Sequence, residues 1–199
     1  MFAFERPACP DYLSGSWEEL GLRYEAEKAE NEAYKFQWTA RFRYENTRQL
    51  LNEMTQGHCA FCDGGDLGAM SRETIEHFKP KSRAEFRRFA YQWENLYPCC
   101  DQCQSQKRED FDEQLLVADE IGYQFDDYFI VDYINGELQP NPLATDENQR
   151  RAQITLELYG LNIAIRLQCR KKELRRYRQR DRDEDVLDDF SYRYFLMDA

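Results

Sequence analysis

The sequence predicts an α+β protein that is mostly helical, with long helices flanking a small cysteine-rich centre. Two long stretches, Trp17–Gln56 and Ala152–Arg180, predict the helices. Between them lie two Cys-x-x-Cys pairs, a spacing typical of metal sites. The dipeptide Asn135-Gly136 separates two short strand-like stretches and predicts a β-hairpin, which supplies part of the β structure.

The first helical stretch, Trp17–Gln56, is dominated by Glu, Lys, Ala and Arg and contains no proline. Gly57 is expected to end this helix. Apolar side chains recur along it at spacings near four, which predicts a single apolar face made of Tyr34, Trp38, Phe42, Leu50 and Met54. Residues 1–56 are therefore expected to form an N-terminal helical extension.

The chemistry is concentrated in residues 57–112, the expected core of the protein. Arg72–Phe78 predicts a short strand that closes before Pro80, because proline cannot donate a ladder hydrogen bond. Ala84–Trp93 predicts a short helix or a loop. Three glycines after the first cysteine pair, Gly64, Gly65 and Gly68, indicate a turn region.

Residues 113–180 are expected to contain the hairpin and a second helical region. Tyr128–Ile134 and Glu137–Gln139 are the predicted strands of the hairpin. The helical stretch Ala152–Arg180 is interrupted near Gly160. Its expected core contacts are Leu156, Leu161, Ile165 and Leu167.

The composition excludes some classes of protein. Hydrophobic residues make up 42% and aromatic residues 15%, which argues against a disordered chain. No apolar run approaches the roughly 18 residues that a membrane helix needs, so no membrane contact is expected. Met1–Pro10 lacks the basic-then-apolar order of a signal peptide, so we expect a cytoplasmic protein.

Charge is unevenly distributed along the chain, whose formal net charge is −11. The segment 181–189 has six acidic residues and one basic residue, whereas residues 166–182 contain nine basic residues. Basic patches can therefore coexist with an acidic whole. The alternative is a solvated helix followed by a frayed acidic tail at 181–199.

The two Cys-x-x-Cys pairs predict a structural Zn²⁺ site, because four thiolates complete the tetrahedral coordination that zinc prefers. The expected ligands are Cys59, Cys62, Cys100 and Cys103. His58 and Cys99 are neighbouring alternatives that break the two-residue spacing. Of the remaining cysteines, Cys9 and Cys169 are expected to be ordinary buried thiols. A redox dithiol is the alternative to zinc.

The segment between the pairs contains Glu76-His77 within Thr74–Ser82, and then Asn95-Leu96. The order Cys-x-x-Cys, acidic-His, Asn-Leu, Cys-x-x-Cys, Lys resembles the HNH endonucleases with a ββα-metal core. The motif Glu-His-Phe-Lys-Pro-Lys-Ser is similar to that of a narrower branch of the family, the HNH subunit of Septu-type and retron-linked anti-phage systems. Leu158–Asn162, followed by Arg170, also resembles that branch. The resemblance is specific over Gly57–Lys107.

The resemblance implies cleavage of DNA phosphodiester bonds, with a partner ATPase subunit in an anti-phage defence complex. It implies that His77 is the catalytic base and that Glu76 binds a catalytic Mg²⁺ or Mn²⁺. Asn95 would orient the loop or the base, and Lys107 would face phosphate. A His near its usual pKa can indeed act as a base at neutral pH, and a carboxylate is a ligand for a hard cation.

The basic side chains beside this motif suit phosphate contact, and Lys79 and Lys81 are the candidates for the DNA backbone. A solvated charged face is the alternative. Neighbouring strand residues point to opposite faces, so Glu76 and His77 can converge only where the strand ends or distorts.

Gln104 departs from the family pattern, which places His or Asn as a metal ligand after the second cysteine pair. Its amide oxygen can still coordinate a hard cation on a longer arm, with Asp101 as another candidate. The alternative function is therefore a degenerate, non-catalytic zinc module that binds protein or nucleic acid. A thiol-redox protein is a third hypothesis.

Overall fold

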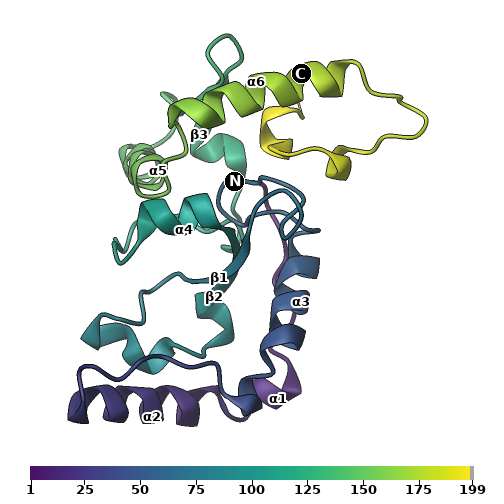
Figure 1. Ribbon diagram of the computed structural model, residues 1–199. Helices are drawn as coiled ribbons and strands as arrows, with labels where there is room; N and C mark the ends of the chain where they lie inside the picture. The colour runs from purple at the N-terminus through teal and green to yellow at the C-terminus, as the bar shows by residue number, and fades with distance from the viewer. Residues whose placement is uncertain (198–199) are drawn as a thin grey trace.

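Figure 1 shows the computed structural model, which describes residues 1–197. The predicted mixture of helices with a small amount of strand is confirmed: within the described residues, the strands form two two-stranded sheets. The first sheet and a short helix lie in the middle of the molecule (Figure 1). An N-terminal helical part lies on one side of this centre, and the C-terminal helices lie on the other.

The central unit is strand, strand, helix. Strand β1 (Glu73–His77) pairs antiparallel with β2 (Leu96–Cys100), and Glu73 lies opposite Cys100. Helix α4 (Asp101–Lys107) begins directly after β2. The long connection between the strands contains the 3₁₀ helices Ala84–Phe89 and Trp93–Asn95. The strand predicted before Pro80 is confirmed as β1.

The N-terminal part contains the short helix α1 (Asp11–Ser14) and two longer helices, α2 (Trp17–Glu30) and α3 (Tyr44–Met54). The predicted single helix Trp17–Gln56 is therefore wrong in its middle, since residues 31–43 are not α-helical. Their aromatic side chains pack on one another and on the central unit instead of forming one helix face. Arg43, the residue directly before α3, adopts a φ of +50°, which is not helical and confirms that the predicted helix is interrupted there.

The hairpin is confirmed as β3 (Phe129–Asp132) and β4 (Glu137–Pro140). The second helical stretch begins earlier than predicted, as α5 (Asp146–Leu158), because the Thr145 side chain caps it by accepting from the Asn148 N–H at 3.2 Å. The predicted interruption is also confirmed. Gly160 adopts a φ of +56° there, a conformation that suits glycine.

Helix α6 (Ala164–Arg178) follows Gly160 and differs from prediction in the face that it buries. Leu156 and Leu161 are buried as expected, whereas Ile165 is 56% exposed. The buried residues of α6 are Arg166, Arg170 and Leu174. The helix therefore packs against polar and sulfur partners that the apolar spacing of the sequence does not reveal.

The segment after α6 is exposed over most of residues 181–189 and then turns back onto the fold. It lies beside α6 (Figure 1), and the Phe190 ring contacts the Tyr177 ring there. Phe190 and residues 193–196 are buried, so the alternative of a frayed tail does not hold for this part. No helix within residues 1–197 has the length and apolar character needed to cross a membrane.

Candidate functional site

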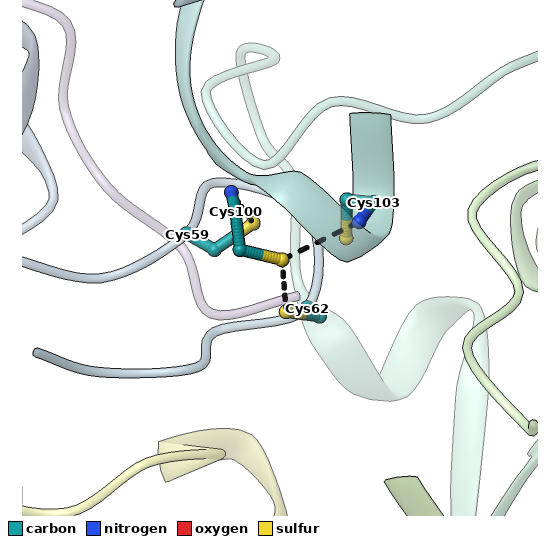
Figure 2. A group of neighbouring side chains, drawn as sticks. All are labelled: Cys59, Cys62, Cys100 and Cys103. Atoms are coloured by element: carbon teal, nitrogen blue, oxygen red, sulfur yellow. Dashed lines mark hydrogen bonds between the residues drawn. The ribbon is translucent and has the colours of Figure 1, made fainter. Parts of the chain in front are cut away.

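Four cysteine sulfurs meet where the loop after α3 approaches the junction of β2 and α4 (Figure 2). They belong to Cys59, Cys62, Cys100 and Cys103, and all four side chains are buried. The sulfur atoms lie within 4.8 Å of one another, and Cys62 Sγ is 3.7 Å from Cys100 Sγ. Tetrahedral zinc with bonds of about 2.3 Å separates its sulfurs by roughly 3.8 Å. The four residues therefore fit a structural metal such as zinc.

Backbone and side-chain donors surround these sulfurs. The Cys100 N–H donates to Cys59 Sγ and the Cys103 N–H to Cys100 Sγ, both at 3.4 Å. The Arg166 Nη2 donates to Cys103 Sγ at 3.0 Å. Such donors favour thiolate over thiol, since a hydrogen bond to the charged form stabilises it. The arrangement is suited to hold a cation through four charged sulfurs.

The alternative ligands point elsewhere. The Cys99 thiol donates to the Cys100 carbonyl oxygen, and burial raises the pKa of Cys99 well above its usual range. The His58 ring bonds the carbonyl oxygens of Gln56 and Phe190 at 2.8 and 3.2 Å. Cys9 and Cys169 are only partly buried, in contrast to the expectation for ordinary core thiols.

A second candidate site lies around the end of β1, where Glu76 and His77 line one pocket of about 250 Å³. Gln104, from α4, and Lys81 also line this pocket, so the structure brings four of the predicted site residues together. The other residues that line it are Pro80, Arg108 and Glu109. The geometric conflict between neighbouring strand residues is resolved because His77 is the last residue of β1.

His77 is held tightly in the wall of the pocket. Its Nε2 lies 2.9 Å from the Ala90 carbonyl oxygen, and its Nδ1 lies 3.3 Å from Lys81 Nζ. The Trp38 ring stacks on the imidazole, with centroids 5.4 Å apart and an interplanar angle of 13°. Burial, assisted by the charge of Lys81, places the pKa of His77 well below its usual range. The imidazole is therefore neutral at pH 7.

Glu76 is paired inside the protein with Lys107. The Lys107 Nζ lies 2.9 Å from Glu76 Oε1 and 3.1 Å from the His77 carbonyl oxygen. Burial raises the pKa of Glu76, and the charge of Lys107 opposes that rise. Lys107 is 0% exposed, which corrects the expectation that it faces phosphate, because an ammonium enclosed in this way cannot reach a ligand outside.

Asn95 acts on the connection between β1 and β2. Its Oδ1 accepts from the Lys79 N–H at 2.7 Å, and its Nδ2 donates to the carbonyl oxygens of Lys79 and Phe89. These bonds hold the backbone at Phe89, the residue directly before Ala90. The Ala90 carbonyl oxygen is the hydrogen-bond partner of His77. Asn95 does not line the pocket.

The two candidate lysines differ in position. Lys81 lines the pocket beside His77, and its Nζ lies 5.1 Å from the centre of the Phe36 ring. Lys79 Nζ lies over the rings of Phe86 and Phe89. Lys79 is not among the residues that line the pocket, so Lys81 alone of the two faces the candidate catalytic groups.

A hard cation such as Mg²⁺ or Mn²⁺ would find a limited set of donors in this pocket. Glu76 and Gln104 provide hard oxygens, the kind of ligand that these cations take, and Mg²⁺ commonly uses only one or two carboxylates. Glu109 provides a further carboxylate in the pocket, which no motif of the sequence singled out. Within residues 1–197, the cysteine cluster is the only group of three or more His, Cys, Asp or Glu side chains suited to a metal.

No family model matches this chain, and no curated protein matches it significantly.

Proposed function

We propose that the chain is a metal-dependent HNH endonuclease that hydrolyses DNA phosphodiester bonds. The observation that carries this proposal is the buried His77 imidazole, held by the Ala90 carbonyl oxygen on the wall of a pocket that also contains Glu76 and Gln104. Phosphodiester hydrolysis needs a base to activate water and positive charge near the phosphate. His77 can supply the base, and the positive charge would come from a cation held by Glu76 and Gln104 and from Lys81 and Arg108 in the same pocket.

His77 would act as the base through Nδ1. A carbonyl oxygen only accepts hydrogen bonds, so the contact with Ala90 places the ring proton on Nε2 and leaves the lone pair on Nδ1. The low pKa of His77 keeps Nδ1 unprotonated at neutral pH, and water would replace Lys81 Nζ, which lies 3.3 Å away, as the donor to that lone pair. Asn95 supports this geometry because it clamps the segment that carries the Ala90 carbonyl.

Glu76 and Gln104 would hold Mg²⁺ or Mn²⁺ through their oxygen atoms. When bound, the cation would stabilise negative charge that develops on the phosphate. Lys81 and Arg108 also line the pocket and would contact phosphate oxygens in place of the buried Lys107. Four buried thiolates would hold the structural Zn²⁺ that fixes β2 and α4, and with them the wall of this pocket.

The net charge of −11 supports a role within a complex. A strongly acidic chain has low intrinsic affinity for DNA, because phosphate binding depends on basic residues. We therefore include in the proposal the partner that the sequence resemblance implies, an ATPase subunit of a cytoplasmic anti-phage defence system. Such a partner would supply basic surface and restrain cleavage.

The test is nicking of supercoiled plasmid by the purified chain in Mg²⁺ or Mn²⁺, compared with the same protein in a chelator-treated buffer. The wild type should nick, and His77→Ala should lose nicking while it retains zinc and its circular dichroism spectrum. Lys35→Ala, a change at an exposed position, is the matched control and should nick as the wild type does. Equal nicking by His77→Ala and the wild type would contradict the proposal.

One observation favours a second function, a non-catalytic zinc module that binds protein or nucleic acid. The Lys107 ammonium already neutralises Glu76 Oε1, so positive charge occupies the position beside the carboxylate where a cation would bind. For such a module, His77→Ala would leave binding to DNA or to a partner unchanged. Measuring binding and nicking with the same variant therefore separates the two functions.

A further inference from the structure

Arg166 is buried beside the cysteine cluster, although the sequence predicts an apolar contact face for this helix. It lies in the first turn of α6 and is 3% exposed. Its Nη2 is 3.0 Å from Cys103 Sγ and 3.9 Å from Cys100 Sγ. A guanidinium is rarely buried without a charged partner, so its position here requires an explanation.

The charge of a filled cluster supplies that explanation. A zinc ion bound by four thiolates carries a net charge of about −2. An uncompensated charge inside a protein is costly, and the cost is lowered by a partner of opposite sign with good hydrogen-bond geometry. Arginine remains protonated under all ordinary conditions, so Arg166 is a permanent counter-charge.

The neighbouring cationic residues of α6 do not share this role. Arg170 bonds the carbonyl oxygens of Gly136 and Leu161, and Arg175 is exposed. Within residues 1–197, Arg166 is the only cationic side chain that donates a hydrogen bond to one of the four cluster sulfurs. Its loss would therefore leave the charge of the centre without a direct partner.

Arg166 also lines a hollow of about 300 Å³ that reaches the cluster from outside. Cys62 and Cys100 line the same hollow, as do the exposed side chains of Ile165 and Met70. A chelator or an alkylating reagent can thus approach these sulfurs from the side on which the guanidinium lies. Arg166 is placed to affect both the affinity of the metal and access to its ligands.

We propose that Arg166 is a positioning residue of the zinc centre, which offsets the charge of the thiolates and fixes α6 against Cys103. The proposal does not depend on nuclease activity, since it concerns the retention of the metal alone. Under this proposal, the position of α6 and the retention of the metal depend on each other. The Arg166 guanidinium stabilises the metal-bound thiolates, and the thiolates provide the charged partner of the buried guanidinium.

The experiment measures the rate at which zinc passes from the purified chain to a chromogenic chelator. Arg166→Gln retains a hydrogen-bond donor and removes the charge, Arg166→Lys retains the charge and removes the planar fork, and Arg175→Gln is the control on the same helix. Changes in groups that support metal ligands commonly cost 10–100-fold in affinity. We expect Arg166→Gln to release zinc about 10-fold faster than the wild type. Arg166→Lys should be intermediate, and Arg175→Gln should match the wild type.

Two outcomes would overturn the proposal. One is a folded, zinc-loaded Arg166→Gln protein that releases zinc at the wild-type rate. The other applies if Arg166→Gln does not fold, in which case the same zinc-release rate is measured for Arg166→Lys. Release from Arg166→Lys at the wild-type rate would then contradict the proposal.

Discussion

The His77 Nε2 donates a hydrogen bond to the carbonyl oxygen of Ala90 at 2.9 Å. This bond joins the end of β1 to the connection that leads to β2, and it fixes the tautomer of a buried imidazole. Because the low pKa of His77 comes mainly from burial, protonation of the ring requires either solvation or a loss of native packing. The pH dependence of stability therefore reports directly on this residue.

We predict that the free energy of unfolding decreases as the pH falls below about 6.5, the usual pKa of histidine in an unfolded chain. Below that pH the unfolded state binds a proton at residue 77 that the folded state does not bind, so stability is lost at up to about 1.4 kcal/mol per pH unit. Above it, neither state is protonated and this contribution is constant. Urea unfolding between pH 5 and 8 measures the effect.

His77→Gln should remove this part of the pH dependence. His58 is present in both proteins, so the difference between the two curves isolates residue 77. The same physical cause predicts that nicking by the wild type is independent of pH above about 6.5. Parallel stability curves for the wild type and His77→Gln would show that His77 is not buried in its neutral form.

The Glu76–Lys107 pair predicts a large effect of removing a single partner. Lys107→Met leaves the Glu76 carboxylate buried without its ammonium, and breaking a buried pair in this way costs about 3–5 kcal/mol. Combining it with Glu76→Gln should restore part of the lost stability, because the amide carries no charge. Urea unfolding of the two single variants and the double variant gives the coupling energy. Lys35→Met is the exposed control, and additive effects of the two changes would contradict the pairing.

The cysteines should divide into classes in their reaction with iodoacetamide. Cys9 and Cys169 are partly exposed and should be alkylated first in the zinc-loaded protein. The four cluster thiols should be protected until a chelator removes the metal, after which they react. Intact-protein mass spectrometry counts the modified residues at each time. Rapid modification of all four cluster thiols before chelation would instead favour the thiol-redox hypothesis.

The parts of the fold that the sequence predicts correctly are those with local causes. The β3–β4 hairpin depends on Asn135-Gly136, the break before α6 depends on Gly160, and the cysteine cluster depends on ligand spacing. Each requires a residue with a special conformation or chemistry at a fixed position. Such signals do not depend on which distant segments pack nearby.

The predictions that were wrong failed because of contacts between segments that are far apart in the sequence. Residues 31–43 have side chains at helical spacing, but Trp38 and Phe36 gain contact with the His77 ring, and this contact with a distant segment replaces the helix. Lys107 occupies the position expected for a phosphate contact, yet it turns inward to Glu76. Arg166 lies among apolar neighbours in sequence and is buried only because sulfur atoms lie opposite it. None of these partners is adjacent in sequence.

A buried ion pair joins Arg193 of the returning C-terminal segment to Asp63, and the two side chains are each 2% exposed. The guanidinium donates to Asp63 Oδ1 at 2.7 Å, and the Arg193 N–H donates to Asp63 Oδ2 at 2.6 Å. Asp63 directly follows Cys62, so the pair attaches the end of the chain to the loop that carries two of the zinc ligands.

Arg193→Met should therefore destabilise the protein by about 3–5 kcal/mol, because the Asp63 carboxylate keeps the backbone N–H of residue 193 but is left buried without its charged partner. The exposed segment 181–189 should become more sensitive to protease, since its anchor at residue 193 is weakened. Arg182→Met is the control, as Arg182 is exposed in the same segment. Limited proteolysis followed by mass spectrometry locates the cuts. Equal rates of cutting in Arg193→Met and Arg182→Met would show that the aromatic residues around Phe190 hold the segment without the ion pair.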